Sequence, residues 1–169
     1  MKTAGILLAI ALALALQTTI KRFVAGGNVP VDLVLVVVVY VALASGSVAG
    51  LLTGTVAGLI QDSLGTGLIG IGGLANTIVG FVSGIVGTQF IVAQPLPRFV
   101  VFFGATILHA VVFYGLYLVL NLRQFGSAYA AIAGQALSNA LVGVVAFQLV
   151  ELLPGAVERR RAARHRIRR

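Results

Sequence analysis

The sequence predicts an all-α polytopic membrane protein with six transmembrane helices in a single domain. Of its 169 residues, 59% are hydrophobic and only 9% are charged, whereas a soluble domain carries roughly 25% charged residues. The mean hydropathy is +1.07, so the chain has too few polar side chains to cover a globule in water. Apolar stretches follow one another with short breaks, and a helix of about 20 apolar residues crosses a bilayer.

The first two spans follow from apolar runs. The span at residues 4–20 is built from Ala, Leu and Ile after Lys2. A signal peptide has the same pattern, but this run is long for one, so we expect a retained helix. The span at residues 30–44 begins with Pro30, which suits a first helical turn because its missing N–H would have no partner there. Its valines would favour a strand in water, but a lone strand in a bilayer leaves backbone groups unsatisfied.

The third span, residues 48–61, is separated from the second by the short polar break at 44–47. Both spans are about 15 residues long, against the usual 17–25. One long bent helix is the alternative, and it would reduce the total to five spans. The Ser-Gly pair at the break is typical of a turn, which favours two helices and six spans.

Three further spans are predicted at residues 68–86, 99–120 and 127–153. Pro95 and Pro97 are expected to stop helix formation before the fifth span. Pro154 and the glycine after it are expected to end the sixth. The single transmembrane domain would therefore cover residues 1–157, followed by a basic cytoplasmic tail at residues 158–169.

Basic residues in the short flanks predict the orientation, because cytoplasmic flanks carry an excess of Lys and Arg. In the six-span order, nine of the twelve cationic residues lie on the side of both termini, which we therefore place in the cytoplasm. Lys21, Arg22 and Arg123 lie on the other side. The first two of these fit better a five-span order in which the N-terminus is outside.

The residue inventory argues against an enzyme. The chain has no cysteine, which excludes disulfides, zinc–thiolate sites and thiol catalysis. Its acidic residues and histidines are Asp32, Asp62, Glu151, Glu158, His109 and His165. This set is too poor for a conventional metal site or catalytic triad, so we expect no catalytic activity, cofactor or metal.

The net charge of +8 describes the C-terminus rather than the whole chain. Seven of the twelve Lys and Arg residues lie in the last eleven positions. A face that binds nucleic acid spreads its charge over a fold, so such binding is not expected. We interpret the segment as a solvated tail that faces anionic lipid through Arg159, Arg160, Arg161 and Arg164. Each cation near an anionic leaflet adds about 1 kcal/mol of attraction.

Glycines at a spacing of four residues form the sharpest pattern. They are Gly46, Gly50, Gly54 and Gly58, and Asp62 takes the next step. Gly80 and Gly84 repeat the spacing in the fourth span. Glycines so spaced leave a smooth groove in which another backbone approaches closely. Packing between this chain's own helices is the favoured interpretation, and a docking groove for a partner helix is the alternative.

Asp32 and Asp62 are predicted at the non-cytoplasmic ends of the second and third spans. An acid near hydrocarbon is costly unless it is paired or wet, so we expect Asp32 either to form a boundary salt bridge with Lys21, Arg22 or Arg123 or to mark the end of the helix. For Asp62, a boundary role and a contact with a cation or a partner protein are equally compatible with the pattern.

His109 falls near the middle of the fifth span. An ionisable residue there is a candidate for function, such as a proton relay, but one neighbouring amide would satisfy a neutral imidazole. We favour packing through Asn76, Gln135 or Asn139. Interhelical hydrogen bonds of this kind are worth about 0.6 kcal/mol each, so they specify how helices pack more than they stabilise the fold. Polar side chains otherwise look scattered singly along the spans, whereas a transporter concentrates them in one pocket.

Residues 50–65 resemble the signature of the rod shape-determining protein MreD family, in which a glycine-rich helix ends in a Gly-Leu-hydrophobic-x-Asp motif. Here the motif runs from Gly58 to Asp62, followed by a glycine-containing loop and the next span. The resemblance implies a non-catalytic protein of the bacterial inner membrane that organises lateral peptidoglycan synthesis in the cell-elongation machinery. It implies as partners the bitopic protein MreC, the peptidoglycan synthases and the cytoskeletal MreB. It also implies a fold similar to the six-helix substrate-binding subunits of energy-coupling-factor vitamin transporters.

That fold similarity leaves a second hypothesis, a substrate-binding subunit of a small-molecule or vitamin transporter. Ala9 and Ala13, or Ala11 and Ala15, match the Ala-x-x-x-Ala pattern through which such subunits dock, although a generic Ala-Leu helix has it too. A third hypothesis is an ion or proton carrier that uses the acid and the histidine just described. The scattered polar residues favour the scaffold over both.

Overall fold

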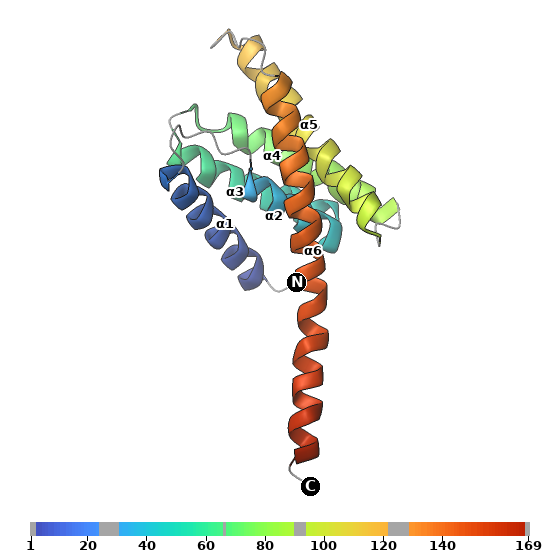
Figure 1. The fold of residues 1–169 in the computed structure, drawn as a ribbon. Helices are drawn as coiled ribbons and strands as arrows, with labels where there is room; N and C mark the ends of the chain where they lie inside the picture. Colours follow the sequence, from blue (N-terminus) through green and yellow to red (C-terminus); the bar gives the residue numbers. More distant parts are fainter. Residues whose placement is uncertain (1–2, 24–30, 66, 90–93, 122–128, 168–169) are drawn as a thin grey trace.

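The computed structural model describes residues 3–23, 31–65, 67–89, 94–121 and 129–167 (Figure 1). This part of the chain folds into six α-helices and contains no strand, which confirms the all-α prediction. The helices are α1 (Thr3–Phe23), α2 (Leu33–Ser45), α3 (Ser47–Leu64), α4 (Ile71–Gln89), α5 (Pro95–Val119) and α6 (Tyr129–Ile167).

Four of these helices are long and apolar enough to cross a membrane. They are α1, α4, α5 and the portion of α6 from Tyr129 to Glu151. Helix α2 is apolar but has 13 residues, so it is about 20 Å long at 1.5 Å per residue. That is shorter than the roughly 30 Å of the hydrocarbon core. The four long helices are those of a membrane protein, as expected.

Helix α2 lies at the centre of the bundle. It packs against each of the other helices, and Val34, Val38, Val41 and Ala42 are fully buried. A helix that is apolar on all sides is stable where it is enclosed on all sides. Because other helices cover most of α2, its short length does not leave its middle facing lipid, and its exposed C-terminal residues, Ala44 and Ser45, lie at one end.

The break between α2 and α3 is a single glycine. Gly46 has a φ of +90°, a backbone conformation that glycine adopts without steric cost, and its N–H donates to the carbonyl of Ala42 at 2.9 Å. The two helices then run antiparallel, since Gln61 near the end of α3 returns to Asp32 at the start of α2. The alternative of one long bent helix is therefore excluded.

Two predicted helix boundaries are wrong, because prolines do not stop these helices. Helix α5 begins at Pro95, and both Pro95 and Pro97 lie in its first turn, where a missing N–H costs nothing. Helix α6 continues through Pro154 to Ile167. The Ala, Glu and Arg residues that follow Pro154 are strong helix formers. The expected division between residues 1–157 and 158–169 therefore falls within one helix, whose end projects away from the bundle (Figure 1).

Candidate functional site

Helices α3 and α4 pack along the glycine stripe. Gly50 faces Gly80, Gly54 faces Asn76, and Gly58 faces Gly73. A Cβ atom at Gly58 would lie 2.7 Å from the Cα of Gly73, and one at Gly54 would lie 2.6 Å from the carbonyl carbon of Asn76. The two backbones are therefore in direct contact, and α4 occupies the groove that these three glycines form.

The ends of the predicted stripe differ from its middle. Gly46 belongs to neither helix, because it forms the turn between α2 and α3. Gly84 packs where α3 begins, and a Cβ there would lie 2.7 Å from the carbonyl carbon of Gly46. Between these ends, the hydroxyls of Thr55 and Thr77 form a hydrogen bond of 2.8 Å across the two helices.

Asp62 joins the end of α3 to the start of α4. Its Oδ2 accepts hydrogen bonds from the N–H groups of Gly70 at 2.8 Å and Gly73 at 3.0 Å. The first N–H groups of a helix lack partners within the helix, and the positive end of its dipole attracts a carboxylate. A Cβ at Gly72 would overlap Oδ1 of Asp62, so a larger residue there would force this carboxylate to shift.

Asp32 holds the start of α2. Its Oδ1 accepts the N–H of Leu35 at 3.1 Å, which is the geometry of an N-terminal cap. The side-chain amide of Gln61 donates to both carboxylate oxygens at 3.3 Å, and the carboxylate residue is only 6% exposed. The expected cation partners, Lys21, Arg22 and Arg123, have side chains outside the described residues.

Buried amides extend this contact into a network that crosses the bundle. Asn76 donates to the amide oxygen of Gln61 at 3.3 Å, and Asn139 accepts the backbone N–H of Asp32 at 2.8 Å. Asn139 also donates to the hydroxyl of Thr106 at 3.1 Å. The expectation that polar side chains are scattered singly is therefore wrong, because residues far apart in sequence meet around α2.

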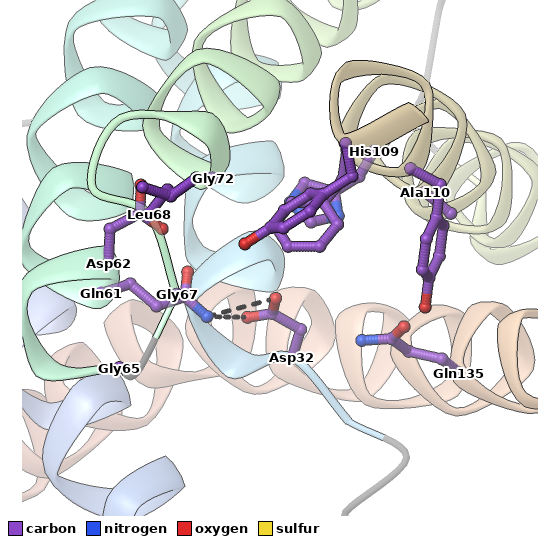
Figure 2. Close-up of a pocket in the computed structure, with 13 residues that line it drawn as sticks. Asp32, Gln61, Asp62, Gly65, Gly67, Leu68, Gly72, His109, Ala110 and Gln135 are labelled. Atoms are coloured by element: carbon purple, nitrogen blue, oxygen red, sulfur yellow. Dashed lines mark hydrogen bonds between the residues drawn. The ribbon is translucent and has the colours of Figure 1, made fainter. Parts of the chain in front are cut away.

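Two members of this network, Asp32 and Gln61, border a pocket of about 310 Å³ together with Asp62. Figure 2 shows Gln61 and Asp62 on one side of it, His109 and Ala110 on the other, and Asp32 and Gln135 beside it. The remaining lining residues are Gly65, Gly67, Leu68, Gly72, Phe113, Tyr114 and Tyr117. Helices α3, α4, α5 and α6 thus meet the start of α2 at one polar cavity.

The ring of His109 faces this pocket (Figure 2) and does not form the expected hydrogen bond with a buried amide. Its ring stacks on Phe113, with 5.8 Å between centroids and 17° between planes. Asn76 and Asn139 are engaged in the network, and Gln135 is a fellow lining residue. In the described part of the chain, no hydrogen bond joins His109 to any of these three amides.

An ion pair between α5 and α6 was missed from the sequence. The guanidinium of Arg98 donates to both carboxylate oxygens of Glu151 at 2.7 and 2.9 Å and lies 4.0 Å from the ring centroid of Phe147. Arg98 is only 4% exposed. The sequence held a signal for this pair, because the start of the fifth span and the end of the sixth lie at the same membrane face.

Residues 158–167 of the basic tail form the end of α6. The backbone of α6 is described to Ile167, but the side chains of Arg159, Arg160, Arg161 and Arg164 lie outside the described residues. Their expected contact with anionic lipid stays a prediction.

Comparison with known proteins matches most of the chain to a family model. A family model described as rod shape-determining protein MreD matches residues 2–154. No curated protein and no solved structure matches the chain. The matched region contains the glycine-packed helices, the Asp62 junction and the polar pocket, and it ends within α6.

Proposed function

The chain belongs to the family of the rod shape-determining protein MreD, and we propose that it serves rod shape determination as a membrane scaffold rather than as an enzyme. In this proposal it organises an MreC-like bitopic protein and the peptidoglycan synthases of the cell-elongation machinery, together with MreB. The family match supports the role in cell shape, and the poor inventory of acids, histidines and cysteines supports a non-catalytic role.

One observation indicates which surface of the scaffold binds a partner helix. The glycines of α3 are already covered by α4, so a partner helix needs another site. Gly134 on α6 has no atom within 4 Å of a Cβ position, and Ala130, one turn earlier, is also exposed. Small residues four apart on a helix let a second transmembrane helix approach closely. The single helix of an MreC-like protein would pack against this face of α6.

The substitution Gly134→Leu tests this surface. It should leave membrane abundance unchanged but reduce co-purification of a co-expressed MreC-like partner, because the branched side chain separates the two helices. Gly104→Leu on α5 is the matched control, since Gly104 also has open space at its Cβ position. Loss of the partner with Gly104→Leu and not with Gly134→Leu would move the interface to α5.

The proposal places the chain in the bacterial inner membrane with both termini in the cytoplasm. The distribution of basic flanks supports this orientation. Because the chain has no cysteine, a single cysteine at residue 2 or after Arg169 can be labelled selectively from one side of the membrane. Labelling of the two ends from opposite sides would contradict the six-span arrangement.

The transporter alternative has one feature in its favour. The polar groups meet in a pocket, as a substrate-binding subunit requires. A fold like that of energy-coupling-factor subunits is part of this alternative. Co-purification with a transporter ATPase instead of an MreC-like protein would favour it.

A further inference from the structure

We infer that the pocket between Asp32, Asp62 and α5 binds a small organic cation, a molecule or side chain that carries a primary ammonium or guanidinium group. This goes beyond the scaffold role, which does not need an open cavity. The inference rests on the pocket's volume, on the charge of its lining and on its aromatic wall.

The pocket is large enough for a ligand. Its volume of about 310 Å³ lies at the lower end of the roughly 300–1,000 Å³ of small-molecule sites. Seams within a bundle are normally filled by side chains at near-crystalline density, as α3 and α4 are where their backbones touch. A cavity of this volume bordered by polar groups is therefore a feature that packing alone does not require.

The lining of the pocket is negatively charged. Asp32 and Asp62 both border it, and no lysine or arginine is among the described lining residues. The recorded hydrogen bonds to the two carboxylates come from neutral donors: the Gln61 amide and backbone N–H groups. In the described residues the one ion pair joins Arg98 to Glu151 instead. Asp32 is buried and has no cation among its partners in the described residues, and a buried carboxylate without a counter-charge is costly. A cation that enters this cavity therefore gains affinity chiefly from Asp32, and the charge of the half-buried Asp62 adds to it.

The opposite wall suits an organic cation. Helix α5 contributes Phe113, Tyr114 and Tyr117 to the lining, and the rings of Phe113 and Tyr117 are 4.9 Å apart. Aromatic faces attract ammonium and guanidinium groups. Among the described residues, no three His, Cys, Asp or Glu side chains are arranged to hold a metal ion. The combination of two carboxylates and an aromatic wall therefore selects an organic cation over a metal.

Two sources supply this chemistry: a free amine, or a Lys or Arg side chain of a protein partner. The full chain purified in detergent can be titrated with agmatine, which carries both cationic groups, and with N-acetyl-arginine amide, which mimics a protein side chain. 1,5-Pentanediol and glutarate serve as neutral and anionic controls of similar length. Tighter binding of agmatine indicates a free amine, and tighter binding of the capped arginine indicates a side chain. Calorimetry that detects neither cation, or no preference over the two controls, would overturn the inference.

Variants assign the binding to this pocket. Asp32→Asn keeps a side chain that caps helices well and should weaken binding about tenfold or more, since it removes a charged acceptor. Tyr117→Leu should weaken it by about threefold or more through loss of an aromatic face. Glu158→Gln, on α6 beyond Pro154 and outside the pocket lining, removes a carboxylate elsewhere and should leave binding unchanged. Circular dichroism checks that each variant is folded, and unchanged binding in both pocket variants would refute the assignment.

Discussion

The α3–α4 pair and the α5–α6 pair are both antiparallel, but the helices of the two pairs contact each other in different ways. The first pair brings backbone against backbone at Gly50, Gly54 and Gly58. The second pair meets through side chains, with Phe102 against Gly143 and the Arg98–Glu151 ion pair near one end. The first contact therefore tolerates no added atom, whereas the second depends on a few strong side-chain interactions.

Two glycines of the second pair have surroundings opposite to those of the first, although Gly143 is covered by the ring of Phe102. Gly104 and Gly134 have no atom within 4 Å of a Cβ position, whereas a Cβ on Gly54 would collide with the backbone of α4. Glycine spacing alone predicts where a helix can be approached. Whether another helix of the same chain already covers that glycine face depends on the fold.

The largest effect is expected from the α3–α4 contact. Gly54→Leu should destabilise the fold by more than about 3 kcal/mol, because overpacking against a rigid backbone forces the helices apart. Gly54→Ala is not a mild test, since its Cβ alone would lie 2.6 Å from a carbonyl carbon, and it should also lower stability. Membrane abundance and thermal unfolding in detergent measure both.

The control for this prediction is Gly104→Leu, where the side chain would enter open space. It should retain the abundance and unfolding temperature of the original protein. If Gly54→Leu behaves like Gly104→Leu, the backbone contact between α3 and α4 is not what holds this region together.

The next largest effect concerns the α5–α6 pair. Glu151→Ala should cost about 3 kcal/mol, because it removes the carboxylate that pairs with the buried guanidinium of Arg98. The double substitution Arg98→Leu with Glu151→Leu should cost less than Glu151→Ala alone, since it removes the buried guanidinium together with its half-exposed partner and leaves no buried charge unpaired. Thermal unfolding by circular dichroism measures the two. A double variant that is less stable than the single one would mean that the pair contributes more than the hydrophobic contact that replaces it.

A smaller effect is expected where α3 joins α4. Asp62→Asn keeps the shape and an acceptor oxygen but removes the charge at the positive end of α4, so it should cost about 1 kcal/mol. The unfolding temperature should fall slightly, and hydrogen exchange at Gly70 and Gly73 should become faster than at Gly80. Unchanged exchange at both positions would show that geometry, rather than charge, secures the start of α4.

The smallest structural effect is expected from His109→Gln. The imidazole stacks on Phe113 and forms no hydrogen bond recorded in the described residues, and glutamine keeps a polar side chain there. We expect unchanged abundance and unchanged rod shape in cells that depend on this protein. Lost rod shape with normal abundance would instead assign His109 a proton-transfer role.

Several elements of the fold could be read directly from the chain. The apolar runs predicted six helices, and the break at Gly46 predicted that α2 and α3 are separate. The motif that ends at Asp62 led to the family that the match over residues 2–154 confirms. Each of these rests on local patterns, since hydrophobic length and a turn residue act within a few positions along the sequence.

The prolines show where local rules fail. Pro95 and Pro97 would end a helix if they lay in its interior. In the first turn of α5 their missing N–H groups cost nothing. Pro154 lies inside α6, where the residues around it continue the helix. The effect of a proline depends on its position relative to a boundary that the sequence does not mark.

What the sequence determined by itself is the class of the molecule: an all-helical membrane protein of a known family, with a glycine pattern suited to close packing. Only the tertiary structure decided that α4 fills the glycine groove and that Asp32 reaches Asn139, 107 positions away. It also decided that the acids, amides and aromatic side chains border one pocket. The physical reason is that helix formation depends on neighbours along the chain, whereas contacts between helices depend on how their surfaces fit together, which no single segment encodes.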